Sequence, residues 1–199
     1  HRRDKMIQYP KGQKQLSRTT KSQTIQTNYS SRGMGLENIL NQTNELYRLQ
    51  KRAVIHKKPT PIQVVKVNYP ARSAAQITEA YYRHASTTDY NGVYKGRYID
   101  FEAKETKNKT SFPLKNIHQH QLDHMKECCE QGGIVFVIFY FSSLKEYYLL
   151  EYKMIEEFIK ESISTRQSIP LTYIQEKGKP IQLSLQMTLN YLDAVDTLL

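Results

Sequence analysis

The stretch YIDFEAKET, residues 98–106, decides the fold that we expect for this chain. Successive side chains of a β-strand point to opposite faces of a sheet. Read as a strand, the stretch has an apolar face made by Ile99, Phe101 and Ala103. Its other face sets two carboxylates and an amine side by side, in Asp100, Glu102 and Lys104. The apolar face predicts a strand anchored in a core, with a charged face available for chemistry.

A tight turn before this strand predicts a hairpin with a defined register. A two-residue loop at 95–96, Lys-Gly, suits the turns that join antiparallel strands. In that register Asp89 lies directly opposite Glu102. A rival turn at 91–92, Asn-Gly, would leave Asp89 opposite Tyr94 instead. We favour the first register, which makes residues 87–105 one β-hairpin.

The pair formed by Asp89 and Glu102 indicates a cation site. Directly opposite residues have Cβ atoms about 4.5–5.5 Å apart, so two carboxylates there repel unless a positive charge lies between them. Oxygen ligands favour Mg²⁺, with Mn²⁺ as an alternative. Lys104 could then stabilise negative charge during phosphodiester hydrolysis. The plainer interpretation is a solvated Glu-x-Lys ion pair, and for Asp100 we expect an exposed charge without a metal role.

The next predicted helix, residues 117–131, offers a second type of metal site. His120 and His124 are four residues apart and could share a zinc ion. The stretch lacks the glutamate of the H-E-x-x-H motif, however, and shows no third ligand. Histidines on a surface that faces solvent or DNA are the simpler interpretation. Gln121 is uninformative by itself.

The charge distribution indicates a polyanionic partner. The formal net charge is +10 and the pI is about 9.5. Basic residues concentrate in residues 1–32 and again between Glu45 and Glu79, where no acidic residue occurs. Clustered cations bind nucleic acid through counterion release, although a basic surface can also serve solubility alone. No run of 18 apolar residues occurs, so we expect no membrane span. The adjacent Cys128 and Cys129 fit a reduced, cytoplasmic protein.

The remaining segments predict an α/β domain with two appendages. Residues 1–30 are polar and basic, and we expect a flexible N-terminal arm there. The core then spans residues 31–199, with a proline-flanked basic insert at 59–72. Within it, periodicity predicts helices at 32–50, 73–84, 153–162 and in the last eleven residues, and strands at 53–58, 134–142 and 146–152. Helices alternating with strands favour a mixed sheet covered by helices.

Three long segments of the sequence resemble a known family. The segments SRGMGLE (31–37), HKKPTPIQVVKVNYPARSAA (56–75) and TTDYNGVYKGRYIDFEAKETKNKTSFPL (87–114) are similar to the RecU family of Holliday-junction resolvases, within the PD-(D/E)XK nuclease superfamily. The resemblance runs from about Met6 to the C-terminus. These long stretches are much more specific than the carboxylate pair alone.

The resemblance implies a homodimeric, Mg²⁺-dependent endonuclease that resolves four-way DNA junctions in recombination and repair, with modulation of the RecA recombinase as a further role. The implied residues fall into three groups: metal ligands Thr87, Asp89, Glu102 and Gln121; a transition-state stabiliser, Lys104; and DNA-binding Arg32, Lys57, Lys58, Lys66 and Arg72. The insert at about 57–83 corresponds to a stalk that enters the junction. The alternative that we retain is a junction-binding or recombinase-regulating protein without catalysis.

Overall fold

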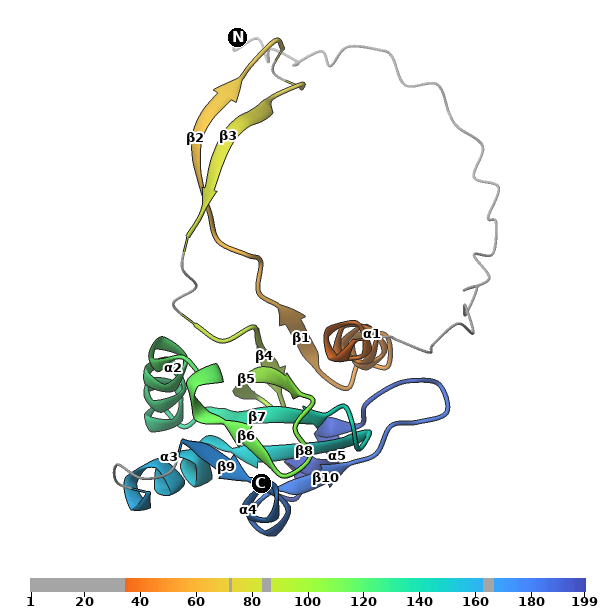
Figure 1. The fold of residues 1–199 in the computed structure, drawn as a ribbon. Helices are drawn as coiled ribbons and strands as arrows, with labels where there is room; N and C mark the ends of the chain where they lie inside the picture. Colours follow the sequence, from red (N-terminus) through yellow and green to blue (C-terminus); the bar gives the residue numbers. More distant parts are fainter. Residues whose placement is uncertain (1–34, 72, 84–86, 163–166) are drawn as a thin grey trace, which may run out of the picture. The chain divides into compact units, whose positions relative to one another are not determined.

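The computed structural model describes residues 35–71, 73–83, 87–162 and 167–199 (Figure 1). A six-stranded sheet lies at its centre, in the order β1-β4-β5-β7-β8-β10. Its strands are β1 (Val54–Lys57), β4 (Tyr90–Tyr94), β5 (Arg97–Thr106), β7 (Ile134–Phe141), β8 (Glu146–Glu151) and β10 (Lys179–Ile181). The pair β5–β7 is parallel and the other pairs are antiparallel, so the sheet is mixed.

Helices cover both faces of this sheet. On one face, α1 (Leu36–Leu49) and α5 (Tyr191–Asp196) pack over a core that includes Phe101 and Phe136. The opposite face is covered by α2 (Gln119–Glu130), α3 (Tyr152–Glu161) and α4 (Leu171–Lys177), over a core that includes Val137 and Phe139. The central strand β7 is apolar throughout because it is buried on both sides. The predicted α/β fold, a mixed sheet flanked by helices, is confirmed.

The hairpin β4–β5 has the predicted register. Tyr94 pairs with Arg97 and Tyr90 pairs with Phe101. Lys95 and Gly96 both have positive φ angles, of 49° and 74°, as a two-residue hairpin turn requires. On the apolar face of β5, the Phe101 ring is fully buried and stacks on Phe136 with ring centroids 4.8 Å apart. Aromatic packing therefore fixes the apolar face of β5, and the opposite face of the strand is turned toward α2.

The connection from β5 to β7 carries α2. The chain leaves β5 through a short strand, β6 (Ser111–Pro113), and a 3₁₀ turn, η1 (Leu114–Asn116), before α2 begins. β6 pairs only with β9 (Ser168–Pro170) in a small separate sheet of the described residues. Helix α2 ends where Gly132 takes a φ of 83°, a left-handed value that glycine adopts readily. Parallel strands need such a crossover, and here the crossover helix supplies side chains to the charged face of β5.

The insert is a β-ribbon, and the helix predicted for residues 73–84 is wrong. β2 (Ile62–Asn68) and β3 (Gln76–Tyr82) pair antiparallel in a two-stranded sheet, drawn as a ribbon in Figure 1. β-branched and aromatic residues in β3 favour an extended chain, and cross-strand pairing with β2 stabilises it. Every residue of the two strands is exposed except Val67, which is half-buried. Lys57 already belongs to β1, so the ribbon begins later than residue 57.

The N-terminal predictions lie partly outside the described residues. Helix α1 begins at Leu36 with Gly35 as its N-cap, later than the predicted start at residue 32. The expected arm at residues 1–30 and the DNA-binding residues Arg32 and Arg72 are not among the described residues. Within the described ranges, every helix is too short or too polar to cross a bilayer.

Candidate functional site

Four of the predicted site residues converge on one end of the β4–β5 hairpin, and we call Asp89, Glu102, Lys104 and Gln121 the Glu102 cluster. The backbone N–H of Asp89 donates a hydrogen bond to Glu102 Oε2 over 3.0 Å. Lys104 Nζ lies 3.2 Å from Glu102 Oε1. The same ammonium donates to Gln121 Oε1 over 2.9 Å. The structure therefore brings together two acidic residues, an amine and an amide from three separate segments.

Local folding explains why these side chains meet. Glu102 and Lys104 are two residues apart on β5 and share the face that is turned toward α2. Asp89 directly precedes β4 and continues the register that sets it against Glu102. Gln121 lies in the first turn of α2, where its Oε1 also accepts a hydrogen bond from the His118 backbone N–H over 3.2 Å. That capping contact fixes the amide against the helix start.

Glu102 is a buried carboxylate whose negative charge is offset mainly by the Lys104 ammonium and the Asp89 backbone N–H. Its side chain is 3% exposed, and that of Lys104 is 14% exposed. Burial raises the pKa of the Glu102 carboxyl above its ordinary value, and the charge of Asp89 raises it further, whereas the Lys104 ammonium lowers it. Two anions held together at the edge of the core favour binding of an additional cation.

The donor chemistry of the cluster fits a hard divalent cation. Carboxylate and amide oxygens are the ligands preferred by Mg²⁺ and Mn²⁺. Gln121 Oε1 already accepts from Lys104 and His118, which uses both of its acceptor positions. Thr87 is half-buried, and its hydroxyl donates to the Thr88 carbonyl oxygen over 3.2 Å. Among the four predicted ligands, Asp89 and Glu102 supply the two carboxylates, and the metal-binding roles of all four residues stay predictions.

A second group lies next to this site on the same face of β5, and here the expectation for Asp100 is wrong. The Asp100 side chain is fully buried instead of exposed. It accepts hydrogen bonds from Lys58 Nζ at 2.9 Å, from Tyr98 Oη at 2.7 Å and from the Thr88 hydroxyl. His124 Nε2 lies 3.1 Å from the same carboxylate. We call Lys58, Thr88, Tyr98, Asp100 and His124 the Asp100 cluster.

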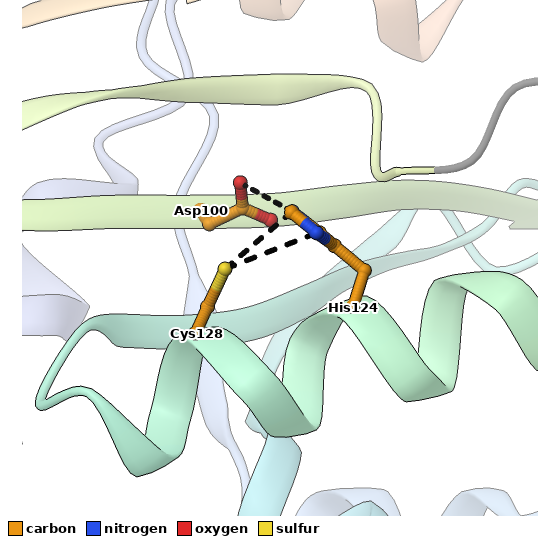
Figure 2. A group of neighbouring side chains, drawn as sticks. All are labelled: Asp100, His124 and Cys128. Atoms are coloured by element: carbon orange, nitrogen blue, oxygen red, sulfur yellow. Dashed lines mark hydrogen bonds and ion pairs between the residues drawn. The ribbon is translucent and has the colours of Figure 1, made fainter.

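The structure pairs His124 differently from the zinc hypothesis. Figure 2 shows Asp100 on β5 facing His124 and Cys128, which lie one turn apart on α2. Their ligand atoms all lie within 4.8 Å of one another, a spacing compatible with a metal ion. His120 stacks on His118 instead, with ring centroids 5.5 Å apart. A zinc site shared by His120 and His124 is therefore not the arrangement that the structure favours.

The basic residues predicted to contact DNA differ in their exposure and in whether they are paired with an acidic residue. Lys66 lies in the exposed β-ribbon. Lys57 Nζ is 2.5 Å from Glu37 Oε2 at the start of α1. The Lys58 side chain is only 19% exposed and its ammonium is held by Asp100. Of these three, Lys66 is the one whose charge is presented directly at the surface.

The sequence did not predict Thr88 and Tyr98 as hydrogen-bond partners of Asp100. Thr88 is 2% exposed, between two predicted ligands, and its hydroxyl points to Asp100. Burial raises the pKa of Tyr98 to about 12, so the phenol stays protonated and donates to Asp100. The available signal was the spacing of Asp100 two residues before Glu102, which places both on the same face of the strand.

Comparison with known proteins finds relatives of the whole chain. The sequence model of the family described as RecU, Recombination protein U, matches residues 31–197. The Holliday junction resolvase RecU of Geobacillus kaustophilus (strain HTA426) is 52% identical over 192 residues, covering 96% of each chain. The protein of the same name from Latilactobacillus sakei subsp. sakei (strain 23K) is 50% identical over 199 residues, covering 96% of this chain and 95% of the relative.

A search of solved structures gives a more distant match. The crystal structure of Hjc, a Holliday junction resolvase from Archaeoglobus fulgidus, aligns with a TM-score of 0.39 at 10% identity. The alignment covers 70% of this chain and 93% of that chain.

Proposed function

This chain belongs to the RecU family, and on that premise we propose that it is a Holliday-junction resolvase. It would be an endonuclease that cuts four-way DNA junctions by paired symmetric nicks in recombination and DNA repair. Relatives about 50% identical over nearly the whole chain carry that name. The observation that supports the proposal most directly is the Glu102 cluster, in which an ammonium lies 3.2 Å from a buried carboxylate that faces Asp89.

Asp89 and Glu102 would hold the catalytic cation, with Thr87 as a further oxygen ligand. Gln121 would be another once Lys104 or His118 releases its hydrogen bond to Oε1. Mg²⁺ is the cation that we propose, and Mn²⁺ meets the same donors. Bound there, a divalent cation supplies Lewis acidity toward a phosphate oxygen and favours deprotonation of a water molecule. The chain's part is to present two anionic groups at a fixed separation, at the edge of a buried sheet.

Lys104 contributes a charge that is already oriented. Its ammonium is held by Glu102 Oε1 and Gln121 Oε1, from β5 and α2 respectively. A cation fixed in a partly buried site stabilises developing negative charge without reorganisation during the reaction. We therefore assign to Lys104 the stabilisation of charge on the scissile phosphate. The stacking of Phe101 on Phe136 keeps the strand that carries Lys104 in place.

Branched DNA is the proposed partner, and the exposed basic residues would contact its phosphates. Lys66 of the β-ribbon is the clearest of them, and the predicted roles of Lys57, Lys58, Arg32 and Arg72 belong to the same proposal. A four-way junction has approximate two-fold symmetry, so paired nicks require two active sites. A symmetric homodimer would supply both of them. A soluble protein that acts on DNA in the cytoplasm and modulates RecA completes this proposal.

The test uses a labelled four-way junction with the full chain and Mg²⁺. We expect symmetric nicks in opposite strands, and Asp89→Asn should slow nicking by about 1000-fold because it removes an anion of the metal pair. Junction binding without metal should be retained, as measured by gel shift. Asp196→Asn is the matched control, since that carboxylate contacts Lys95 on the far side of the hairpin.

Two outcomes would contradict the proposal. Symmetric nicking at the unchanged rate by Asp89→Asn would show that this carboxylate is not used. Tight junction binding without any nicking, and without heat of binding for Mg²⁺ or Mn²⁺ in calorimetry, would support the alternative of a junction-binding protein that has no catalytic activity.

A further inference from the structure

The Asp100 carboxylate is surrounded by four side-chain partners. Its side chain is fully buried in β5. One oxygen, Oδ2, lies 2.9 Å from Lys58 Nζ, 2.7 Å from Tyr98 Oη and 3.1 Å from His124 Nε2. The other, Oδ1, accepts from the Thr88 hydroxyl. A buried carboxylate is tolerated only when it is paired and hydrogen-bonded, and Asp100 meets both conditions.

The donors of Asp100 come from the segments that carry the proposed metal ligands. Thr88 lies between Thr87 and Asp89 in sequence. His124 lies three residues after Gln121 on α2. Asp100 itself precedes Glu102 by two residues on one face of β5. One carboxylate thus ties together the segment before β4, the strand β5 and the crossover helix.

Lys58 adds a second link to the same segment. Its backbone N–H donates to the Asp89 carbonyl oxygen over 2.7 Å. Its ammonium donates to Thr88 Oγ1 over 3.0 Å as well as to Asp100. Lys58 therefore holds Thr88 through its side chain and Asp89 through its backbone. This restricts the direction in which the Asp89 carboxylate leaves the chain.

We propose that Asp100 is a positioning residue, which fixes Asp89, Glu102 and Gln121 relative to one another without touching metal or substrate. The proposal rests on the proposed function, because it concerns the ligands of that site. Groups that orient metal ligands by hydrogen bonds typically change metal affinity about 10–100-fold when they are removed. Asp100 acts in this way through Thr88 and His124.

A zinc ion is the competing interpretation of the same atoms. Asp100, His124 and Cys128 offer oxygen, nitrogen and sulfur ligands (Figure 2). The Lys58 ammonium, however, already supplies a positive charge 2.9 Å from Asp100 Oδ2 and lies 3.5 Å from His124 Nε2. Burial raises the pKa of the Cys128 thiol, and the charge of Asp100 raises it further, which disfavours the thiolate that zinc requires. We therefore assign the cation of this cluster to Lys58.

The experiment measures Mn²⁺ affinity without DNA, by electron paramagnetic resonance, on the full chain and three variants. Asp100→Ala should bind Mn²⁺ about 10–100-fold more weakly than the wild type. Asp100→Asn keeps an acceptor for Thr88, so its Mn²⁺ affinity should lie between those of the wild type and Asp100→Ala. Thr88→Val removes one hydroxyl from the cluster with little change in volume, and it should weaken Mn²⁺ binding even if Asp100→Ala does not fold.

Controls separate positioning from general damage and from failure of the proposed function. Asp196→Asn, a carboxylate outside both clusters, should keep wild-type affinity, and thermal unfolding confirms that each variant is folded. Excess Mn²⁺ should restore junction nicking by Asp100→Asn, because the ligands remain present, but it should not restore nicking by Asp89→Asn.

Each remaining outcome overturns a defined statement. Folded Asp100 and Thr88 variants with wild-type Mn²⁺ affinity would refute the positioning role, while Asp89-dependent Mn²⁺ binding by the wild type would leave the proposed function intact. A wild type that binds no Mn²⁺ and leaves the junction uncut would overturn both proposals, whereas one that binds no Mn²⁺ yet cuts the junction would overturn only the positioning role. Stoichiometric zinc in the purified protein that disappears in Cys128→Ser would replace Lys58 with a metal ion as the cation of the cluster.

Discussion

Two buried carboxylates, Asp100 and Glu102, lie two residues apart on one face of β5 and have opposite surroundings. Asp100 meets four side-chain groups, three at Oδ2 and one at Oδ1. Within the described residues, Glu102 meets two donors, the Asp89 N–H and the Lys104 ammonium. Burial raises the pKa of Glu102, and the charge of the second carboxylate, Asp89, raises it further.

The difference separates a residue that holds the structure from one that is available for a ligand. A carboxylate that is already surrounded by four partners is less available to a metal ion. Glu102 keeps acceptor positions available beside a like charge, and that combination is typical of metal and active sites. Burial alone therefore does not distinguish the two roles. The number of neighbouring hydrogen-bond partners and the charge of the neighbouring groups do distinguish them.

The largest expected effect comes from neutralising each carboxylate in turn. Glu102→Gln should reduce junction nicking by about 1000-fold, yet leave the free energy of unfolding equal or higher, because it removes a buried anion beside Asp89. Asp100→Ala should lower the free energy of unfolding by about 3 kcal/mol, since it leaves Lys58 without its buried partner. Urea unfolding of the metal-free proteins measures both. Equal losses of stability in the two variants would contradict the distinction.

An intermediate effect is expected from comparing two lysines, one held by Asp100 and one exposed. Lys66→Ala should weaken junction binding and reduce the slope of log affinity against log salt by about 1, the contribution of one phosphate contact. Lys58→Ala should change the slope less, because its ammonium is already paired with Asp100. Lys177→Ala, at the end of α4, serves as the surface control. Equal slopes for Lys58→Ala and Lys66→Ala would contradict the assignment.

The smallest expected effect concerns a carboxylate that is paired near the surface. Burial acts to raise the pKa of Asp196, but hydrogen bonds from Lys95 and Tyr94 outweigh it, and the pKa lies below its ordinary value. A lowered pKa stabilises the folded state above the pKa of the unfolded chain, and this contribution is lost as pH falls through the folded value. Asp196→Asn should therefore be slightly less stable than the wild type at neutral pH. The difference should vanish in acid, as thermal unfolding at several pH values would show.

The hairpin could be predicted because its determinants are local. The Lys95-Gly96 turn requires two positive φ angles, and that requirement sets which residues of β4 and β5 face each other. Strand alternation then places Glu102 and Lys104 together. Asp89, thirteen residues before Glu102, follows from the same register. The opposition of Asp89 and Glu102 thus needed no knowledge of the rest of the chain.

Asp100 could not be predicted because its partners are distant in sequence. Lys58 is 42 residues away and His124 is 24 residues away, and only the complete fold brings them to β5. The predicted contribution of Gln121 rested on family resemblance, since its approach to Lys104 depends on where the crossover helix starts. The helix predicted for residues 73–84 was wrong for a different reason. A short polar and aromatic segment fits the helical and the strand periodicity equally well, and its pairing with β2 decides between them.

The parallel pairing of β5 with β7 has a consequence for the order of folding. Glu102 is registered with Val137, and Met125 of α2 belongs to the same buried cluster as Val137 and Phe139 of β7, so the packing of α2 depends on β7. A growing chain that ends before β7 already contains Asp89, Glu102, Lys104 and Gln121, yet lacks the strand that fixes β5 and α2 together. Parallel pairing across such a connection forms late, because the long loop must close first. The cutting activity would then be acquired only after β7 has been made, so shorter unfinished molecules would leave DNA intact.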